Sequence, residues 1–128
     1  MAGARGPAYR RRMDSGARTP EELEMLFEDA FVVRDRAGFC TLFDDGAVLA
    51  PGGASEARGG EAIGRAAAEL WTAGRTYVGG ASRVLEARET ALVVSPAGIH
   101  VARRVPDGTW RVAISLLDLP TPSEPEDS

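Results

Sequence analysis

Residues 99–117 read IHVARRVPDGTWRVAISLL, with apolar side chains at every second position on both sides of Asp107-Gly108. This period is typical of β-strands that bury one face. An Asp-Gly pair between two such runs predicts a two-residue hairpin turn. The turn would also set the register of the two strands, with Val101 opposite Ile114.

The two faces of this predicted hairpin differ in polarity. One face carries Val101 and Ile114 among other apolar residues, and Arg103 is its single charge. The other face is small and polar, and it places His100 opposite Ser115. Because burial of apolar surface drives folding, we expect helices to cover the face with Val101 and Ile114. The face with His100 would then be left for solvent or for a second subunit.

Helical patterns come before the strands. Residues 19–22, TPEE, form a capping box, and an apolar stripe follows at helical spacing: Leu23, Leu26, Phe27, Ala30 and Phe31. A short helix is predicted after Asp35 and a longer one over residues 61–71. Strands are predicted at three places before the hairpin: residues 47–50, 75–88 and 91–95. Helices followed by a meander of strands predict an α+β fold with helices on one face of a sheet.

The chain of 128 residues is long enough for one domain. Residues 1–18 are rich in arginine and lack apolar periodicity, and residues 120–128 contain prolines and acids without a bulky apolar group. Such segments bury too little surface to offset the entropy of ordering. We therefore predict a disordered Arg-rich tail at 1–18, one domain at 19–119 and a disordered acidic tail at 120–128.

Composition excludes several classes of partner and site. The net charge is −4, which argues against a nucleic acid as the main partner. One cysteine, Cys40, and one histidine, His100, cannot form an intrachain disulfide or a four-ligand zinc site, so we expect no metal and no cofactor. No apolar run approaches the ~18 residues of a membrane helix. We expect no membrane contact and a cytoplasmic location.

The order of the motifs resembles the nuclear transport factor 2-like superfamily, in its SnoaL-like and ketosteroid isomerase-like bacterial branch. The resemblance rests on the capped first helix, on LFDD at residues 42–45 before a strand, on RGGEAI at 58–63 and on RVPDGTWR at 104–111. It covers nearly all of residues 19–119. It implies a cone-shaped, curled antiparallel sheet packed against three N-terminal helices, with an apolar pocket between them, usually in a homodimer.

The resemblance does not extend to the catalytic groups of ketosteroid isomerases. Their general-base aspartate would fall here at Ala50 or Pro51, and their oxyanion-holding tyrosine near Phe27 or Ala30. Their second, protonated aspartate would fall near Val101. None of these residues can perform those roles, so steroid isomerisation is not expected. The superfamily also hosts cyclases, dehydratases and pure binding modules, so the fold alone does not define a function.

A ligand site is predicted around Arg103. A guanidinium on an apolar face could hold a carboxylate or phenolate oxygen, although it could equally reach solvent or pair with an acid. Trp71 and Tyr77 could form the mouth of the pocket and stack on a planar ligand, or simply belong to the core. The predicted ligand-binding residues are Arg103, Trp71, Tyr77, Val101, Ile114 and Phe27.

Two residues are candidates for acid–base chemistry. His100 is the only imidazole in the chain, and Asp118 lies at the end of the last strand. No third group completes a catalytic set with either residue in the sequence. Three functions therefore remain open: binding of a small apolar or aromatic molecule, either neutral or anionic; a proton-shuttling isomerase or cyclase; and a dimeric assembly module without a ligand.

Overall fold

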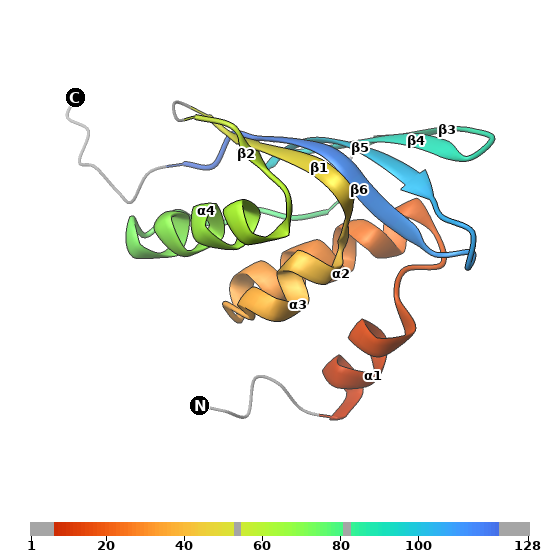
Figure 1. The fold of residues 1–128 in the computed structure, drawn as a ribbon, viewed down its shortest axis with the longest axis horizontal. Coiled ribbons are helices and arrows are strands. Elements are labelled where there is room, and N and C mark those ends of the chain that lie inside the picture. The colour runs from red at the N-terminus through yellow and green to blue at the C-terminus, as the bar shows by residue number, and fades with distance from the viewer. Residues whose placement is uncertain (1–6, 53–54, 81–82, 121–128) are drawn as a thin grey trace.

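The computed structural model describes residues 7–52, 55–80 and 83–120. All four helices lie on one side of a six-stranded sheet, which confirms the predicted α+β class (Figure 1). In chain order the elements are α1 (Pro7–Ser15), α2 (Pro20–Val32), α3 (Arg36–Thr41), β1 (Phe43–Pro51), β2 (Ala57–Arg58), α4 (Gly60–Thr72), β3 (Arg83–Ala87), β4 (Thr90–Ser95), β5 (Gly98–Arg104) and β6 (Trp110–Leu117).

The strand order is β2-β1-β6-β5-β4-β3. All neighbouring strands are antiparallel except β1 and β6, which are parallel, so the sheet is mixed rather than purely antiparallel as expected. The reason is the connection through α4, which carries the chain from β2 at one edge to β3 at the other. The meander from β3 to β6 then returns to the centre and runs alongside β1 in the same direction.

The turn between β5 and β6 is longer than the predicted two residues. The Gly108 N–H donates to the Val105 carbonyl at 2.8 Å, and the Val105 N–H donates to the Thr109 carbonyl at 2.8 Å. Gly108 has a φ of 90°, which a glycine adopts without strain. This turn pairs Arg104 with Trp110. The pairs next to the turn are therefore displaced by one residue from the predicted register.

An irregularity in β6 restores the predicted register further along the hairpin. The pairing shifts between Val101 and Ala102, so that Ala102 lies opposite Val112 while Val101 lies opposite Ile114. The extra residue in β6 is Ala113, and such a bulge lets one strand take up one residue more than its partner. Beyond it, the predicted pairs are confirmed.

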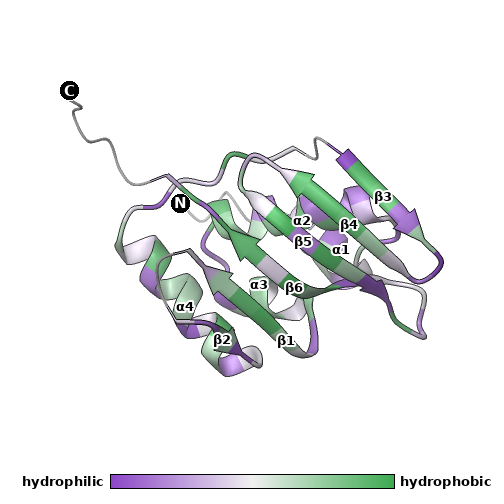
Figure 2. Cartoon of the chain, turned by 90° about the horizontal axis from the view of Figure 1, so that it is seen from above, coloured by the Kyte–Doolittle hydropathy of each residue, from purple (hydrophilic) through white to green (hydrophobic). Residues whose placement is uncertain are grey.

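The prediction of which face the helices cover is wrong. His100 and Ser115 are fully buried under the helices, whereas Ile114 is 43% exposed on the opposite, outer face. The polar residues can be buried because partners from α2 and from the loop after α4 satisfy them, as described below. No described helix covers the outer face, along which hydrophobic residues follow the strands (Figure 2).

Part of the predicted N-terminal tail is folded. Residues 7–15 form α1, where Tyr9 is buried and its hydroxyl donates to Asp35 at 2.8 Å. Arg12 forms an ion pair with Asp29 at 3.0 Å, and Met13 packs against the core. These contacts extend the folded unit beyond the expected limit of residue 19. Residues 1–6 and 121–128 of the predicted tails lie outside the described residues.

The segment after α4 is a loop over residues 75–80, where the sequence predicted a strand. Gly80 has a φ of 99°, and Gly79 packs closely on the carboxylate of Glu28, which would have to move if a side chain were added there. Both features turn the chain across α2 and delay the start of β3 until Arg83. Across residues 7–52, 55–80 and 83–120, no helix is long and apolar enough to span a membrane.

Aromatic rings fill the space between sheet and helices. The apolar stripe predicted on α2 is buried, and the Phe27 ring lies 4.8 Å from that of Phe39. Trp71 and Tyr77 also lie in this core, with rings 5.5 Å from Phe31. The predicted pocket between sheet and helices is therefore occupied by side chains of the protein itself.

Candidate functional site

Four polar side chains lie together in this core, and we call them the interior cluster: Glu24, Tyr77, His100 and Ser115. Their exposed fractions are 1%, 6%, 0% and 0%, respectively. A buried carboxylate and imidazole are costly unless each is hydrogen-bonded. The cluster is therefore the feature of the core that most requires an explanation.

Hydrogen bonds use both ring nitrogens of His100. Its Nε2 lies 3.1 Å from Oε1 of Glu24, and its Nδ1 lies 2.9 Å from Oγ of Ser115. The Tyr77 hydroxyl donates to Oε2 of Glu24 at 2.9 Å and lies 3.4 Å from Nε2 of His100. Both carboxylate oxygens of Glu24 are thus occupied, and each side chain of the cluster has a partner.

Three parts of the fold position these side chains. Glu24 lies on the buried side of α2, and His100 faces Ser115 across the central strands β5 and β6. Tyr77 lies on the loop after α4, between the helices and the far edge of the sheet. The Phe27 ring lies 4.3 Å from the His100 ring and forms an apolar wall beside it.

For the neutral form of His100, the protons of the cluster have one consistent arrangement. Burial, and then the negative charge of Glu24, raises the pKa of Tyr77, so its hydroxyl keeps its proton and donates to Glu24. With Glu24 as an acceptor on both oxygens, neutral His100 donates through Nε2 and leaves Nδ1 to accept from Ser115. A proton can then move from the serine hydroxyl to the imidazole while the carboxylate stabilises the imidazolium.

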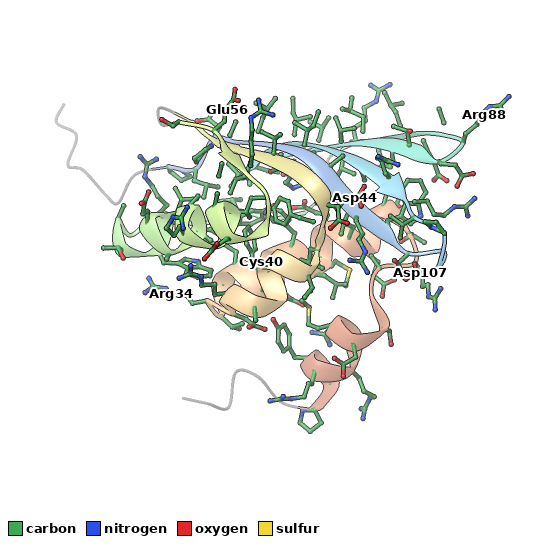
Figure 3. The ribbon with its side chains drawn as sticks, in the orientation of Figure 1. Arg34, Cys40, Asp44, Glu56, Arg88 and Asp107 are labelled. Atoms are coloured by element: carbon green, nitrogen blue, oxygen red, sulfur yellow. The ribbon has the colours of Figure 1, made fainter. Side chains whose placement is uncertain are left out.

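The predicted ligand-binding residues do not meet in one place. Arg103 lies on the outer face, with its side chain 60% exposed and 3.5 Å from that of Asp44. Asp44 is labelled at the start of β1 in Figure 3. Val101 and Ile114 lie on the same outer face. Phe27, Trp71 and Tyr77 lie on the other side of the sheet, in the core. Ligand binding by this set stays a prediction, now divided between two faces.

The two predicted acid–base residues also differ in position. His100 lies inside the protein, whereas the sequence placed it on the outward face. Asp118 is exposed just beyond β6, and its backbone N–H donates to the Ala97 carbonyl at 2.8 Å. Only His100 is placed among groups that could exchange a proton with it.

Sequence reasoning missed Glu24 and Ser115 as members of a site. Glu24 follows the acidic first turn of the predicted helix, where an acid is expected to face solvent. Its spacing contained a signal, because it precedes Phe27 by three residues and Phe31 by seven and so shares their face. Ser115 was recognised as the partner of His100 but on the wrong side of the sheet.

A hollow of about 550 Å³ lies between α1, α3 and the start of β6. Two of its acids are engaged within the protein, since Asp35 accepts from Tyr9 and from the Gly38 N–H and Asp107 accepts from Thr109, and the third, Asp14, is exposed to solvent. It therefore offers no group comparable to the interior cluster.

Comparisons with known proteins define the fold. No protein-family model and no curated protein sequence matches the chain. A ketosteroid isomerase-like protein from Erwinia carotovora atroseptica is similar with a TM-score of 0.68 and 15% identity over 80% of this chain and 94% of that one. A protein from Novosphingobium aromaticivorans, described as NTF2-like with a cystatin-like fold, has a TM-score of 0.64 and 20% identity over 91% and 89%.

A third solved structure is a candidate dehydratase of the NTF2-like family from Streptomyces avermitilis. Its TM-score is 0.58, with 19% identity over 73% of this chain and 88% of that one. Likeness at these identities establishes the fold and not the chemistry. The chain therefore has the nuclear transport factor 2-like fold, as its sequence motifs predicted.

Proposed function

We propose that this protein of nuclear transport factor 2-like fold binds a small, mostly apolar molecule at the interior cluster, where His100 moves a proton to or from it. One observation carries the proposal: His100 is held on one ring nitrogen by Glu24 and on the other by Ser115, with all three fully buried. A carboxylate that orients an imidazole beside a hydroxyl is the arrangement that general acid–base catalysis requires.

The surroundings of the cluster favour such chemistry. The walls are aromatic, so water is excluded and each electrostatic interaction inside is strengthened. Tyr77 is the one member of the cluster that does not lie on a helix or strand. Movement of its loop breaks no regular backbone ladder, which makes Tyr77 the member that can most easily give way to a ligand.

A purely structural network is the competing explanation, and a ligand screen with an NMR readout distinguishes the two. The chain contains one histidine, so a single imidazole signal reports on the cluster. We would screen aromatic acids, polyketide-like phenols and steroids by thermal shift, where a ligand at 100 times its Kd stabilises by about 2.7 kcal/mol. A hit should displace the His100 signal and lose affinity in Glu24→Gln.

Arg103→Gln serves as the matched control, because this side chain is exposed on the outer face. It should leave binding and the His100 shift unchanged. For a confirmed ligand, incubation in D2O should incorporate deuterium with the wild type and not with His100→Asn. Hits that never move the His100 signal, or deuterium incorporation that survives His100→Asn, would refute the proposal.

We further propose that the outer face of the sheet joins two copies of the chain in a homodimer. Leu85, Leu92, Val101, Ile114 and Val48 lie opposite one another on successive strands and form an apolar row across the sheet. Monomeric proteins rarely expose a continuous apolar patch of this kind. A second copy supplies a matching row, and Arg103 and Asp44 at the rim provide both signs of charge for pairing.

Light scattering after size-exclusion chromatography tests the dimer. Ile114→Glu places a charge in the centre of the row and should convert the protein to a monomer. Met25→Glu is the control, because Met25 is 53% exposed on α2, away from the sheet. A wild-type protein that is monomeric at micromolar concentration would exclude this interface.

A further inference from the structure

A small cavity of about 50 Å³ lies where β1, β6 and α4 all end. Pro51 and Leu117 are paired at the ends of the two parallel strands, and both line the cavity. The remaining lining residues are Gly52, Leu70, Arg75, Asp118 and Leu119. We call this region the mouth, since it opens between the sheet and the last turn of α4.

The mouth adjoins the interior cluster along two segments of the chain. Leu117 lies two residues beyond Ser115 on the same face of β6, which places their Cα atoms about 7 Å apart. Arg75 precedes Tyr77 by two residues on the loop after α4. Two segments that line the mouth therefore continue directly into the cluster.

Arg75 lacks a carboxylate partner within the described part of the chain. Its Nη1 donates to the Leu119 carbonyl at 2.8 Å, and no ion pair involves it there. Asp118 lines the same cavity but is exposed and does not reach ion-pair distance of Arg75. A half-buried guanidinium with five donors and one neutral acceptor has capacity for an anion.

A second donor, in α4, also lacks a partner among the described residues. Trp71 follows Leu70 in α4, and its buried indole Nε1 has no hydrogen-bond partner among the described residues. A buried donor needs an acceptor, which either water or a ligand can supply. Leu119, only 5% exposed, fills the space that the apolar part of such a ligand would need.

We propose that the ligand of the interior site is a small carboxylic acid with an apolar or aromatic body. Its carboxylate replaces the Leu119 carbonyl on Arg75, and its body displaces the Leu119 side chain and points toward His100. A planar carboxylate matches the fork of a guanidinium through two parallel hydrogen bonds. This inference rests on the proposed function, because it identifies the molecule on which the interior cluster acts.

Matched probes test the charge requirement on the full chain. Benzoate and trans-cinnamate carry a carboxylate, and benzyl alcohol and cinnamyl alcohol have the same bodies without it. The His100 imidazole signal is followed in titrations at pH 7.5 and constant ionic strength. We expect the acids to bind and the alcohols to bind at least about tenfold more weakly, the loss typical of one charge-assisted contact.

Four variants assign the preference to the mouth. Arg75→Gln should bind acid and alcohol alike, whereas Arg103→Gln, which removes the same charge from the outer face, should keep the preference. Leu119→Gly removes the side chain but retains the backbone carbonyl, and it should bind the acids several-fold more tightly. Arg75→Lys keeps the charge and should keep part of the preference for acids. It can be compared with the wild type if Arg75→Gln does not fold.

The outcomes separate this inference from the proposed function. Neutral probes that move the His100 signal equally well in wild type and Arg75→Gln would overturn the inference and leave the interior site standing. Acids whose binding requires Arg75 but leaves the His100 signal unmoved would keep the mouth as an anion site and refute the interior function. Wild-type protein that binds none of the acids at millimolar concentration would overturn the inference.

Discussion

The Nε2 atom of His100 and the Oε1 atom of Glu24 lie 3.1 Å apart, although 76 residues separate them in the chain. Both residues are buried. Helix α2 supplies the acid and strand β5 supplies the base, so the pair exists only once the helix has packed on the sheet. Four of the five predictions below concern this pair or the sheet that carries it.

Loss of the Glu24 carboxylate should destabilise the protein strongly. Glu24→Ala leaves His100 and the Tyr77 hydroxyl without their shared acceptor in the core. The expected cost is about 3 kcal/mol of unfolding free energy, measured by urea denaturation. Glu21→Ala, at an exposed position of the same helix, should cost less than about 0.5 kcal/mol. Equal effects of the two variants would contradict the role of Glu24.

The proton of His100 should reside on Nε2 at neutral charge. Imidazole ¹⁵N shifts of labelled protein distinguish the two tautomers, and the single histidine makes the assignment direct. Ser115→Ala removes the donor to Nδ1 and should cost about 1 kcal/mol while shifting the Nδ1 signal. A proton found on Nδ1 of the wild type would contradict the proposed hydrogen-bond directions.

Alkaline pH should weaken the fold through Tyr77. Burial, and then the charge of Glu24, raises its pKa above the value of about 10 in the unfolded chain. The folded state therefore holds this proton more tightly, so the contribution is complete below pH ~10 and is lost as the pH rises above it. Unfolding free energy measured from pH 8 to 11 should fall with pH in the wild type.

Tyr77→Phe is the variant that checks this slope. It should be less stable at neutral pH, because Glu24 loses a donor, and its stability should depend less on pH above 10. Tyr9→Phe, which alters the other tyrosine, should keep the wild-type slope from Tyr77. If the unfolding free energy of Tyr77→Phe fell with pH as steeply as that of the wild type, Tyr77 would not be the cause of the pH dependence.

Charge on the outer face should separate the proposed dimer. Leu116 is 52% exposed and lies beside Ile99 in the second row of that face. Leu116→Glu should raise the dimer dissociation constant at least about a hundredfold, the loss expected when a charge enters an apolar interface. Analytical ultracentrifugation measures it, and a dimer of unchanged affinity would place the interface elsewhere.

Close approach of the backbone at Gly98 should make that position intolerant of a side chain. A Cβ atom there would collide with the carbonyl oxygen of Leu116 on the neighbouring strand. Gly46, with a φ of 73° and open space around it, is the control with backbone strain alone. Thermal unfolding should show a cost of about 1 kcal/mol for Gly46→Ala and at least about 3 kcal/mol for Gly98→Ala.

Local patterns along the chain were enough to predict most of the elements. The Thr19 cap is confirmed, with its hydroxyl accepting from the Glu22 N–H at 3.0 Å, and the apolar stripe of α2 is buried as expected. Pairing of Val101 with Ile114 is confirmed as well. These features depend on residues a few positions apart, whose interactions are readable from spacing.

Register near the turn and the start of β3 could not be read from spacing. The longer turn at Gly108 and the bulge at Ala113 offset each other, and neither leaves a distinct mark in an alternating pattern. The loop at Gly79 depends on the Glu28 carboxylate of α2, a contact made only after the helix packs. Likewise α1 is held by Asp29 and Asp35, which belong to α2 and the turn after it.

The choice of the buried face was decided by tertiary structure alone. The alternating pattern of β5 and β6 established that two unlike faces exist, and their polarity favoured burial of the apolar one. The fold buries His100 and Ser115 instead, because Glu24 and Tyr77 satisfy them from distant parts of the chain. Pairing of a buried polar group depends on partners in space, and no spacing within the hairpin records them.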